Sequence, residues 1–328
     1  MEAKSCICNM AKIQETETEW LWYPYIPYGK VTIIQGDPGE GKTTLALNIA
    51  AALTKGENVT GGKTDPITGQ ELYPVPVLFQ TAEDGLADTI KPRLVAAGAD
   101  CGYISGVDES VYPLTITDGR LDEALRLTNA RLIILDPLQA YLGADVDMHR
   151  ANEIRPVMSY LSNMAEQFGC AIILIGHMNK NTGAKAAYRG LGSIDLTAAA
   201  RSVLLVARDK RDTDRRIVMH IKSSLAREGK PVAFRLGDNN SFTYEGECEA
   251  DPDSILLGAA PVPQQTQTDL AKQFLMAELG SGEVKPAKVI TEKAGSTGIL
   301  PDTLRKAKLA MKVKSFKRDN IWCWQLIN

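Results

Sequence analysis

A phosphate-binding loop constrains this chain more than any other feature of its sequence. The stretch from Gly36 to Thr43 reads GDPGEGKT and fills every fixed position of the pattern G-x-x-x-x-G-K-[ST]. Residues 31–35 before it form a short β-branched run, and residues 44–53 after it carry apolar side chains at helical spacing. A strand, a glycine-rich turn and a helix in this order are what a nucleoside triphosphate site requires.

Each part of this loop has a chemical role. The glycines let backbone N–H groups point at a phosphate, and the start of the helix adds positive potential at the same place. Lys42 then reaches the β- and γ-phosphate oxygens, and the Thr43 hydroxyl binds Mg²⁺. The predicted nucleotide-binding residues are Gly36, Asp37, Pro38, Gly39, Glu40, Gly41, Lys42, Thr43 and Thr44, and the predicted cofactors are ATP and Mg²⁺.

Size and composition set outer limits. With 328 residues and 44% hydrophobic content, the chain suits one large globular domain and a small second one. No apolar run approaches the ~20 residues needed to span a bilayer. Residues 1–18 are too polar and acidic for a signal peptide. The six cysteines contain no C-x-x-C pair, which argues against a zinc module and favours a reducing, cytoplasmic location.

Strand and helix patterns alternate through the first two thirds of the chain. Expected strands cover residues 76–80, 132–136, 171–176, 202–207, 216–221 and 232–236, and expected helices cover 86–97, 121–127 and 152–168. This alternation predicts an α/β fold in which helices cover both faces of a mostly parallel sheet. Because the last strands follow one another closely, we expect the far edge of the sheet to be antiparallel.

A change of composition separates a small C-terminal region. Residues 247–268 begin with alternating acids and continue with Ala, Pro and Gln, which is typical of a linker. Residues 269–328 contain three helical patterns and a hairpin, an arrangement that resembles a winged helix. We therefore expect an N-terminal tail (1–18), an ATPase domain (19–246), the linker and a winged-helix-like domain. A protein-binding module of the same shape is the alternative.

Charge is unevenly distributed along the chain. The net charge is −3, but residues 265–328 carry 11 basic and 6 acidic side chains, against 26 and 34 in residues 1–264. A basic end on an acidic body suggests contact with an anion, and nucleic acid is the first candidate. The expected DNA contacts in this region are Arg305, Lys306, Lys308, Lys317 and Arg318. A solvated surface is the alternative.

Two acids at strand ends are candidates for binding Mg²⁺ and activating water. An apolar run ends in Asp136, the Walker B pattern, so we expect Asp136 to hold Mg²⁺ together with Thr43. Because Pro137 follows it, the water-polarising acid lies elsewhere. Glu83 follows another expected strand, at the sheet edge where ligands bind, and can orient water toward the γ-phosphate. Asp84 is the competing candidate, although it also suits the first turn of a helix.

His177 ends a further apolar strand and starts an unusual stretch. At this edge of the sheet it can sense the γ-phosphate, although a structural role is the alternative. Residues 178–190 are rich in Gly, Ala and basic residues and have no aliphatic anchor. We expect this loop to couple the nucleotide to DNA, with Lys180, Lys185 and Arg189 on phosphates. An unengaged surface loop is the competing interpretation.

Together these residues resemble the RecA-like ATPases, and specifically the plasmid RepA-type hexameric helicases and their phage and mobile-element relatives. The matching stretches are Trp20-Leu21-Trp22, Gly36–Thr43, Ala82-Glu83-Asp84, Leu135-Asp136, His177, Arg189–Ser193, Ala200-Arg201 and Lys222-Ser223-Ser224. The C-terminal region also resembles the winged-helix ends of some phage and integrative-element ATPases, through Trp322-Cys323-Trp324 among others.

The resemblance implies a ring with shared active sites. It assigns Glu83 as the catalytic base and His177 as the sensor, in a homo-oligomer that is expected to be hexameric. Each subunit is expected to send an arginine finger into its neighbour's site, where the finger neutralises charge on the transferred phosphoryl group. Single-stranded DNA is expected in the channel, and duplex DNA at the winged helix.

Arg201 matches the finger position, and Arg189 is a second candidate. An ordinary ion pair is the alternative role for Arg201. Lys222 matches a basic residue that acts in trans. Ser224 stands where relatives often carry a further polar or basic residue, which weakens that assignment.

The sequence thus predicts an ATP-hydrolysing, ring-forming DNA motor, a replicative helicase of a phage or mobile element. The alternative is a DNA-binding ATPase that loads, remodels or represses without unwinding. A small-molecule kinase is a third class, disfavoured because no lid is evident and the C-terminal region is basic.

Overall fold

Contacts within the computed structural model divide the chain into two units, Met1–Leu257 and Gly258–Asn328, which are described separately. The structure describes residues 9–144, 146–148, 150–177, 194–238, 241–250, 255, 267–280 and 282–326. Lys180, Lys185 and Arg189 of the expected DNA-binding loop lie outside these residues. No described helix is both long and apolar enough to span a membrane.

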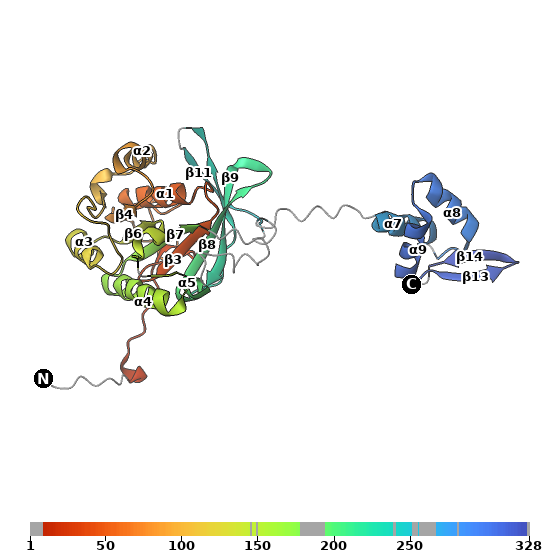
Figure 1. Cartoon of the computed structure of the whole chain (residues 1–328), viewed down its shortest axis with the longest axis horizontal. Coiled ribbons are helices and arrows are strands. Elements are labelled where there is room, and N and C mark those ends of the chain that lie inside the picture. The colour runs from red at the N-terminus through yellow and green to blue at the C-terminus, as the bar shows by residue number, and fades with distance from the viewer. Residues whose placement is uncertain are drawn as a thin grey trace. The chain divides into compact units, whose positions relative to one another are not determined.

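A large sheet organises the first unit (Figure 1). In its described part, nine strands are ordered β11-β10-β9-β8-β3-β7-β6-β4-β5. Their bounds are β3 Val31–Gly36, β4 Val77–Thr81, β5 Ile104–Ser105, β6 Leu132–Asp136, β7 Ala171–His177, β8 Ser202–Asp209, β9 Asp212–Ser223, β10 Val232–Leu236 and β11 Phe242–Glu247. Strands from β8 to β5 are parallel, and β8 to β11 are antiparallel. The predicted mostly parallel sheet with an antiparallel edge is confirmed.

Helices cover both faces of this sheet, which gives three layers. The elements outside the sheet are η1 Met10–Lys12, β1 Trp20–Trp22, β2 Ile26–Pro27, α1 Lys42–Thr54, the π-helical η2 Leu86–Ile90, α2 Lys91–Ala96, η3 Cys101–Tyr103, α3 Arg120–Thr128, η4 Leu138–Tyr141, α4 Ala151–Phe168 and α5 Ile194–Ala199. Buried side chains of α3, α4 and α5 share one hydrophobic cluster with the sheet, and those of α1 and α2 share a second with its other face. The helix expected over residues 86–97 is therefore two elements, η2 and α2.

The sequence pattern explains the two-sided burial. Strand β6 reads LIILD and is buried throughout, as expected of a parallel strand with helices on both faces. Helix α4 buries Ile154, Met158, Leu161 and Ala165 along one stripe. Full burial of one such Ile, Leu or Met contributes roughly 1.5–3 kcal/mol. The helix ends where Gly169 adopts a positive φ of 60°.

Strand β11 was not predicted from the sequence. Its residues alternate between half-buried and exposed, as on a one-sided edge strand. The ring of Phe242 stacks on Phe234 of β10, with 4.9 Å between centroids. Beyond β11, the side chains of Cys248, Ala250 and Ile255 pack against the cluster formed by β8 and β9. The first part of the expected linker therefore contacts the first unit.

The second unit combines three helices with a small sheet. The elements are α7 Gln267–Leu279, β12 Lys285–Pro286, α8 Ala287–Ser296, α9 Pro301–Ala310, β13 Lys314–Arg318 and β14 Ile321–Gln325, with sheet order β12-β14-β13. Leu275, Ile290 and Leu304, one from each helix, meet in its core. The hairpin β13–β14 turns through Asp319 and Asn320, both at positive φ, as a two-residue type I′ turn requires.

Candidate active site at the carboxyl ends of the parallel strands

Four neighbouring parallel strands end together at one edge of the sheet. The register pairs Gly36 at the end of β3 with His177 at the end of β7, and Thr81 at the end of β4 with Asp136 at the end of β6. Residues following these strand ends therefore gather in one place, although they are far apart in the sequence. This edge is where open α/β sheets bind ligands.

The phosphate-binding loop connects β3 to α1 at this edge. Gly39 and Gly41 have φ values of +78° and +87°, which side chains rarely tolerate. A Cβ on Gly41 would also lie 3.0 Å from the side chain of Leu236. The loop therefore depends on glycine at these positions, because backbone N–H groups must face inward at the start of α1.

Lys42 is buried inside the loop. Its side chain is held because Nζ donates to the carbonyl oxygens of Gly36 and Asp37, at 3.0 and 2.8 Å. Burial lowers the pKa of Lys42, and the nearby Asp136 carboxylate opposes that shift. A desolvated cation at the start of a helix is an environment that favours an anion such as a phosphate.

Thr43 and Asp136 form an oxygen pair next to Lys42. The Thr43 hydroxyl donates to Asp136 Oδ2 at 2.6 Å. Asp136 is only 4% exposed, and burial raises the pKa of its carboxyl while the hydrogen bond from Thr43 lowers it. A half-buried hydroxyl beside a buried carboxylate suits a hard cation that takes oxygen ligands. Thr43 and Asp136 are thus the residues that would hold Mg²⁺, which neutralises charge on a phosphoryl group.

A side-chain relay leads from the loop to Glu83. Lys42 Nζ lies 3.3 Å from His177 Nδ1, and His177 Nε2 lies 3.4 Å from Glu83 Oε1. An ammonium can only donate, so Nδ1 is the acceptor toward Lys42, and Nε2 is the ring nitrogen that can donate to Glu83. The relay brings together Lys42, His177 and Glu83, which lie at or after the ends of three different predicted strands.

Glu83 and Asp84 differ in their surroundings. The carboxylate of Asp84 accepts a hydrogen bond from Arg93 Nη1 at 3.1 Å, so it is paired with helix α2. The Glu83 side chain is 55% exposed and contacts His177. Of these two acids, Glu83 is the one whose carboxylate faces the loop and water.

Arg201 and Lys222 lie at the opposite edge of the sheet. The N–H of Arg201 donates to the carbonyl of Val31, at the beginning of β3. Its own phosphate loop begins beyond the other end of that strand, roughly 16 Å away at ~3.3 Å per residue. Arg201 is exposed. Lys222 Nζ donates to the carbonyls of Thr197, Ala198 and Ala200 at 2.9, 2.7 and 2.8 Å, and so caps the C-terminal end of α5.

Two arginines beside the loop were missed by the sequence reasoning. Arg208, at the end of β8, places Nη2 3.5 Å from the carbonyl of Gly39 and Nε 4.0 Å from the Glu40 carboxylate. The strand-end rule that found Glu83 could have found Arg208 as well. Arg216 on β9 is buried against Gly41, and its Nε has no hydrogen-bond partner among the described residues. No local pattern indicates Arg216, because an antiparallel strand brings it there.

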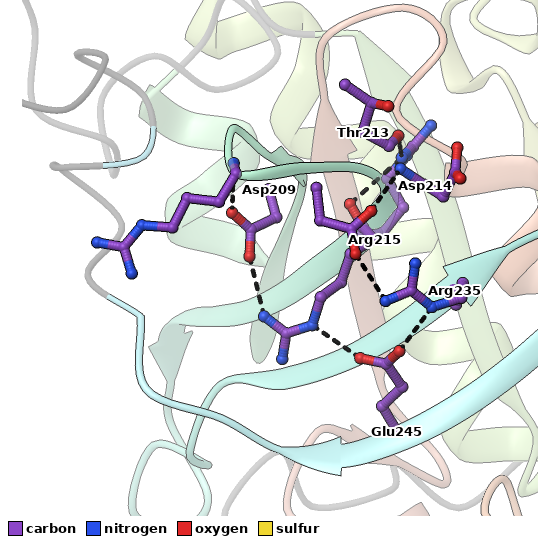
Figure 2. Close-up of polar contacts among 9 residues, drawn as sticks. Asp209, Thr213, Asp214, Arg215, Arg235 and Glu245 are labelled. Carbon is purple, nitrogen blue, oxygen red and sulfur yellow. Dashed lines mark hydrogen bonds and ion pairs between the residues drawn. The ribbon is translucent and has the colours of Figure 1, made fainter.

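The antiparallel edge carries a ladder of ion pairs that differs from this site (Figure 2). Arg215 bridges Asp209 at 2.9 Å and Glu245 at 2.7 Å. Arg235 bridges Glu245 at 2.9 Å and Asp212 at 2.7 Å. Each charged side chain in the ladder faces an opposite charge. The ion pairs therefore hold β9, β10 and β11 together, and their charges are already neutralised within the fold.

The expected DNA contacts of the second unit have mixed surroundings. Arg305 pairs with Asp302 at 3.3 Å, and Arg318 approaches Asp319 at 4.0 Å. Lys308 donates to Ser315 Oγ at 2.6 Å. Lys306 is exposed, as is Lys317, whose ammonium lies over the ring of Trp322. Of these cations, Lys306 and Lys317 are the ones that the surrounding side chains leave accessible to an anion.

Comparison with known proteins places the first unit in a family. A family model described as an AAA domain matches residues 4–183, which is more than half of the chain. The chain is 25% identical over 237 residues to the DNA repair protein RadA of Mycobacterium tuberculosis, covering 72% of this chain and 42% of that protein. It is 26% identical over 240 residues to the RadA of Mycolicibacterium smegmatis, covering 71% and 44%.

The chain therefore spans less than half the length of these curated relatives. Among solved structures, a KaiC-like protein from Pyrococcus horikoshii OT3 is similar, with 21% identity and a TM-score of 0.46. The match covers 67% of this chain and 90% of that one.

Proposed function

Because the chain belongs to the AAA-domain family and is a RecA-like P-loop ATPase, we propose that it is an ATP-driven DNA motor. In this proposal it forms a ring and works as a replicative helicase of RepA type, from a phage or mobile element. Nucleotide lies between subunits, and each turnover moves a DNA strand.

One observation carries the proposal, namely the relay from Lys42 through His177 to Glu83. It joins the groups that hold phosphate to the carboxylate that would orient water, with heavy-atom separations of 3.3 and 3.4 Å. His177 also stands directly before residues 178–190, the basic stretch proposed to grip DNA. A change at the γ-phosphate would thus reach the DNA-binding segment through a single side chain.

The proposed hydrolysis divides roles among described residues. Lys42 binds the phosphate oxygens, and Thr43 with Asp136 would hold Mg²⁺. Glu83 accepts a hydrogen bond from water and aligns it with the γ-phosphate, since positioning dominates phosphoryl transfer. The half-exposed Glu83 carboxylate is free for that role, whereas the Asp84 carboxylate is paired with Arg93.

A shared site is supported by the position of Arg201. It is exposed at the edge of the sheet opposite its own loop, so its side chain cannot reach the phosphate site of its own subunit. We propose that it completes the neighbouring site as an arginine finger. The Lys222 ammonium stabilises this edge of the sheet because it caps the C-terminal end of α5. Its own action in trans stays a weaker proposal, because all three of its N–H donors are used within the chain.

DNA as the partner rests on two supports. The relatives that match 71–72% of this chain are called DNA repair proteins. The second unit is basic and combines three helices with a hairpin, as a winged helix does. We propose single-stranded DNA in the ring, with contacts from Lys180, Lys185 and Arg189, and duplex DNA at the second unit.

The test is the rate of ATP hydrolysis by the assembled protein with and without single-stranded DNA. We expect stimulation of at least fivefold by a long oligonucleotide and none with Lys42→Ala. An Arg201→Ala subunit should lack hydrolysis alone but regain part of it when mixed with Glu83→Gln subunits, because each variant supplies what the other lacks. Hydrolysis that is indifferent to single-stranded DNA would contradict the motor.

A non-unwinding DNA-binding ATPase is the second candidate, favoured by the cluster of cations on α9 and the following hairpin. A forked duplex with a labelled strand separates the two functions. ATP-dependent strand release that is lost in Lys42→Ala supports the helicase. Tight binding to a selected duplex sequence without strand release supports the regulator. Electron micrographs with an ATP analogue and single-stranded DNA should show closed rings in the first case.

A further inference from the structure

The positive charge of the second unit is concentrated in its last third. Residues 267–296 hold four basic and four acidic side chains, whereas residues 301–325 hold seven basic and two acidic ones. In the first group, Glu278 binds both Lys285 and Lys293, at 3.3 and 3.0 Å. The first group is therefore compensated internally, and the excess belongs to α9 and the hairpin β13–β14.

Two tryptophans share one face of that hairpin. The register pairs Trp322 with Lys317 and Trp324 with Ser315, so both rings point to the same side. The Lys317 ammonium lies 5.7 Å from the centre of the Trp322 ring, and the Lys308 ammonium lies 4.4 Å from that of Trp324. Each ring thus has a cation beside it, held by attraction to the ring's electrons.

The two rings differ in burial. Trp324 packs against the hydrophobic core of the unit. Trp322 is two residues nearer the hairpin turn and is 56% exposed. Because more than half of its surface is exposed, Trp322 contributes little to the core, and much of its apolar ring is open to solvent beside Lys317.

An exposed aromatic ring flanked by cations matches the chemistry of single-stranded nucleic acid. Each base offers a flat π-face to stack on, and each phosphate offers a charge. Inside a duplex both faces of a base are already stacked on neighbouring pairs, and separating them costs energy, so an unpaired base is the better partner for the ring. We propose that Trp322 is a stacking platform for an unpaired base of DNA, with Lys317 on an adjoining phosphate.

This inference rests on the proposed function, since it assumes that DNA is the partner. It adds that the second unit holds an unpaired strand, as at a fork, in addition to any duplex read by α9. A winged helix that used only α9 in a groove would gain nothing from an exposed ring at the hairpin.

The first experiment measures how the full chain, without nucleotide, binds a labelled single strand of thymidines across a salt series. Trp322→Ala should weaken binding roughly tenfold without changing the salt slope, because stacking releases no counterions. Lys317→Ala should weaken binding and reduce the slope by about 0.7. Trp322→Phe should keep most of the affinity. Ile321→Ala, a neighbour that is 53% exposed, is the matched control and should stay within twofold.

The second experiment identifies the contact directly. A single strand carrying 5-bromouracil should crosslink to Trp322 of the full chain under ultraviolet light, and a duplex that carries 5-bromouracil in its interior and is closed at both ends by non-nucleotide linkers should not. Binding by Trp322→Ala equal to the parent, or a crosslink that maps elsewhere, overturns the inference. If the crosslink forms but ATP hydrolysis ignores DNA, the motor fails and the stacking site stands. If DNA stimulates hydrolysis without the crosslink, only the stacking site fails.

Discussion

The parallel and antiparallel halves of the central sheet use charge in opposite ways. At the ends of β3, β7, β6 and β4, buried Lys42 and Asp136 have pKa values shifted toward their neutral forms, and burial is the main cause. In the ladder on β9, β10 and β11, Arg215 and Arg235 meet carboxylates on both sides (Figure 2). Charges that satisfy one another stabilise the fold. Charges held at an energetic cost mark the place where a ligand supplies the missing partner.

The largest effect on ATP hydrolysis is expected when Lys42 is replaced. Lys42→Ala should reduce ATP hydrolysis at least about 100-fold, because it removes the cation that we propose to bind the β- and γ-phosphates. The thermal stability of the nucleotide-free protein should change little or rise, since a desolvated ammonium is lost. Steady-state hydrolysis and a melting curve on the same preparation check both parts. A variant that unfolds instead would mean that Lys42 holds the loop rather than the ligand.

The antiparallel half also buries His220, which provides an independent test of this comparison. Its Nδ1 accepts a hydrogen bond from the N–H of Gly229, and its Nε2 lies 3.0 Å from Ser202 Oγ, which donates to the Tyr25 carbonyl. Burial lowers the pKa of His220 to about 4. The imidazole is thus neutral and serves the fold.

Acid should therefore destabilise the protein through His220. The unfolded state takes up the proton near pH 6.5 and the folded state only near pH 4, so stability is lost as pH falls between those values. From pH 7 to pH 5 the loss from this one residue should be about 2 kcal/mol. Urea unfolding of the parent and His220→Gln at both pH values measures it. Parallel pH profiles for the two proteins would contradict a neutral, buried His220.

Replacing Asp136 should increase the stability of the protein and remove its activity. Its raised pKa means that the folded state favours the uncharged carboxyl, so a neutral replacement is favoured at pH 7. Asp136→Asn should raise the melting temperature of the nucleotide-free protein by about 2 °C and remove Mg²⁺-dependent hydrolysis. Scanning calorimetry with and without Mg²⁺ checks it. A lowered melting temperature without ligand would place Asp136 among the structural charges.

The smallest effect is expected in the ion-pair ladder. Glu245→Gln should cost about 0.5–1 kcal/mol of unfolding free energy, because exposed pairs are screened by water and salt. The cost should shrink further in 1 M salt, where the Debye length is about 3 Å. ATP hydrolysis should stay within twofold of the parent. Strongly reduced hydrolysis would show that the two halves are not separable.

Local patterns and strand ends made much of the fold and site predictable. Lys42, Thr43 and Asp136 lie in short motifs, and the carboxyl ends of parallel strands meet at one edge, so Glu83 and His177 could be placed near them. The mostly parallel sheet followed from alternating patterns. Strand β11 was missed because it has one polar face and runs directly into acidic residues. Arg216 was missed because tertiary pairing alone carries it to Gly41.

We propose that Glu83, through its contact with His177, activates water in a site where Lys42, Thr43 and Asp136 bind phosphate and Mg²⁺. Single-turnover hydrolysis by Glu83→Gln, measured beside ATP binding and with Asp84→Asn as the matched control, tests it most directly. We predict unchanged binding within twofold and a rate about 100- to 1,000-fold lower for Glu83→Gln. Asp84→Asn should keep its rate within about fivefold. A near-parental rate for Glu83→Gln, or its collapse in Asp84→Asn instead, would contradict the account.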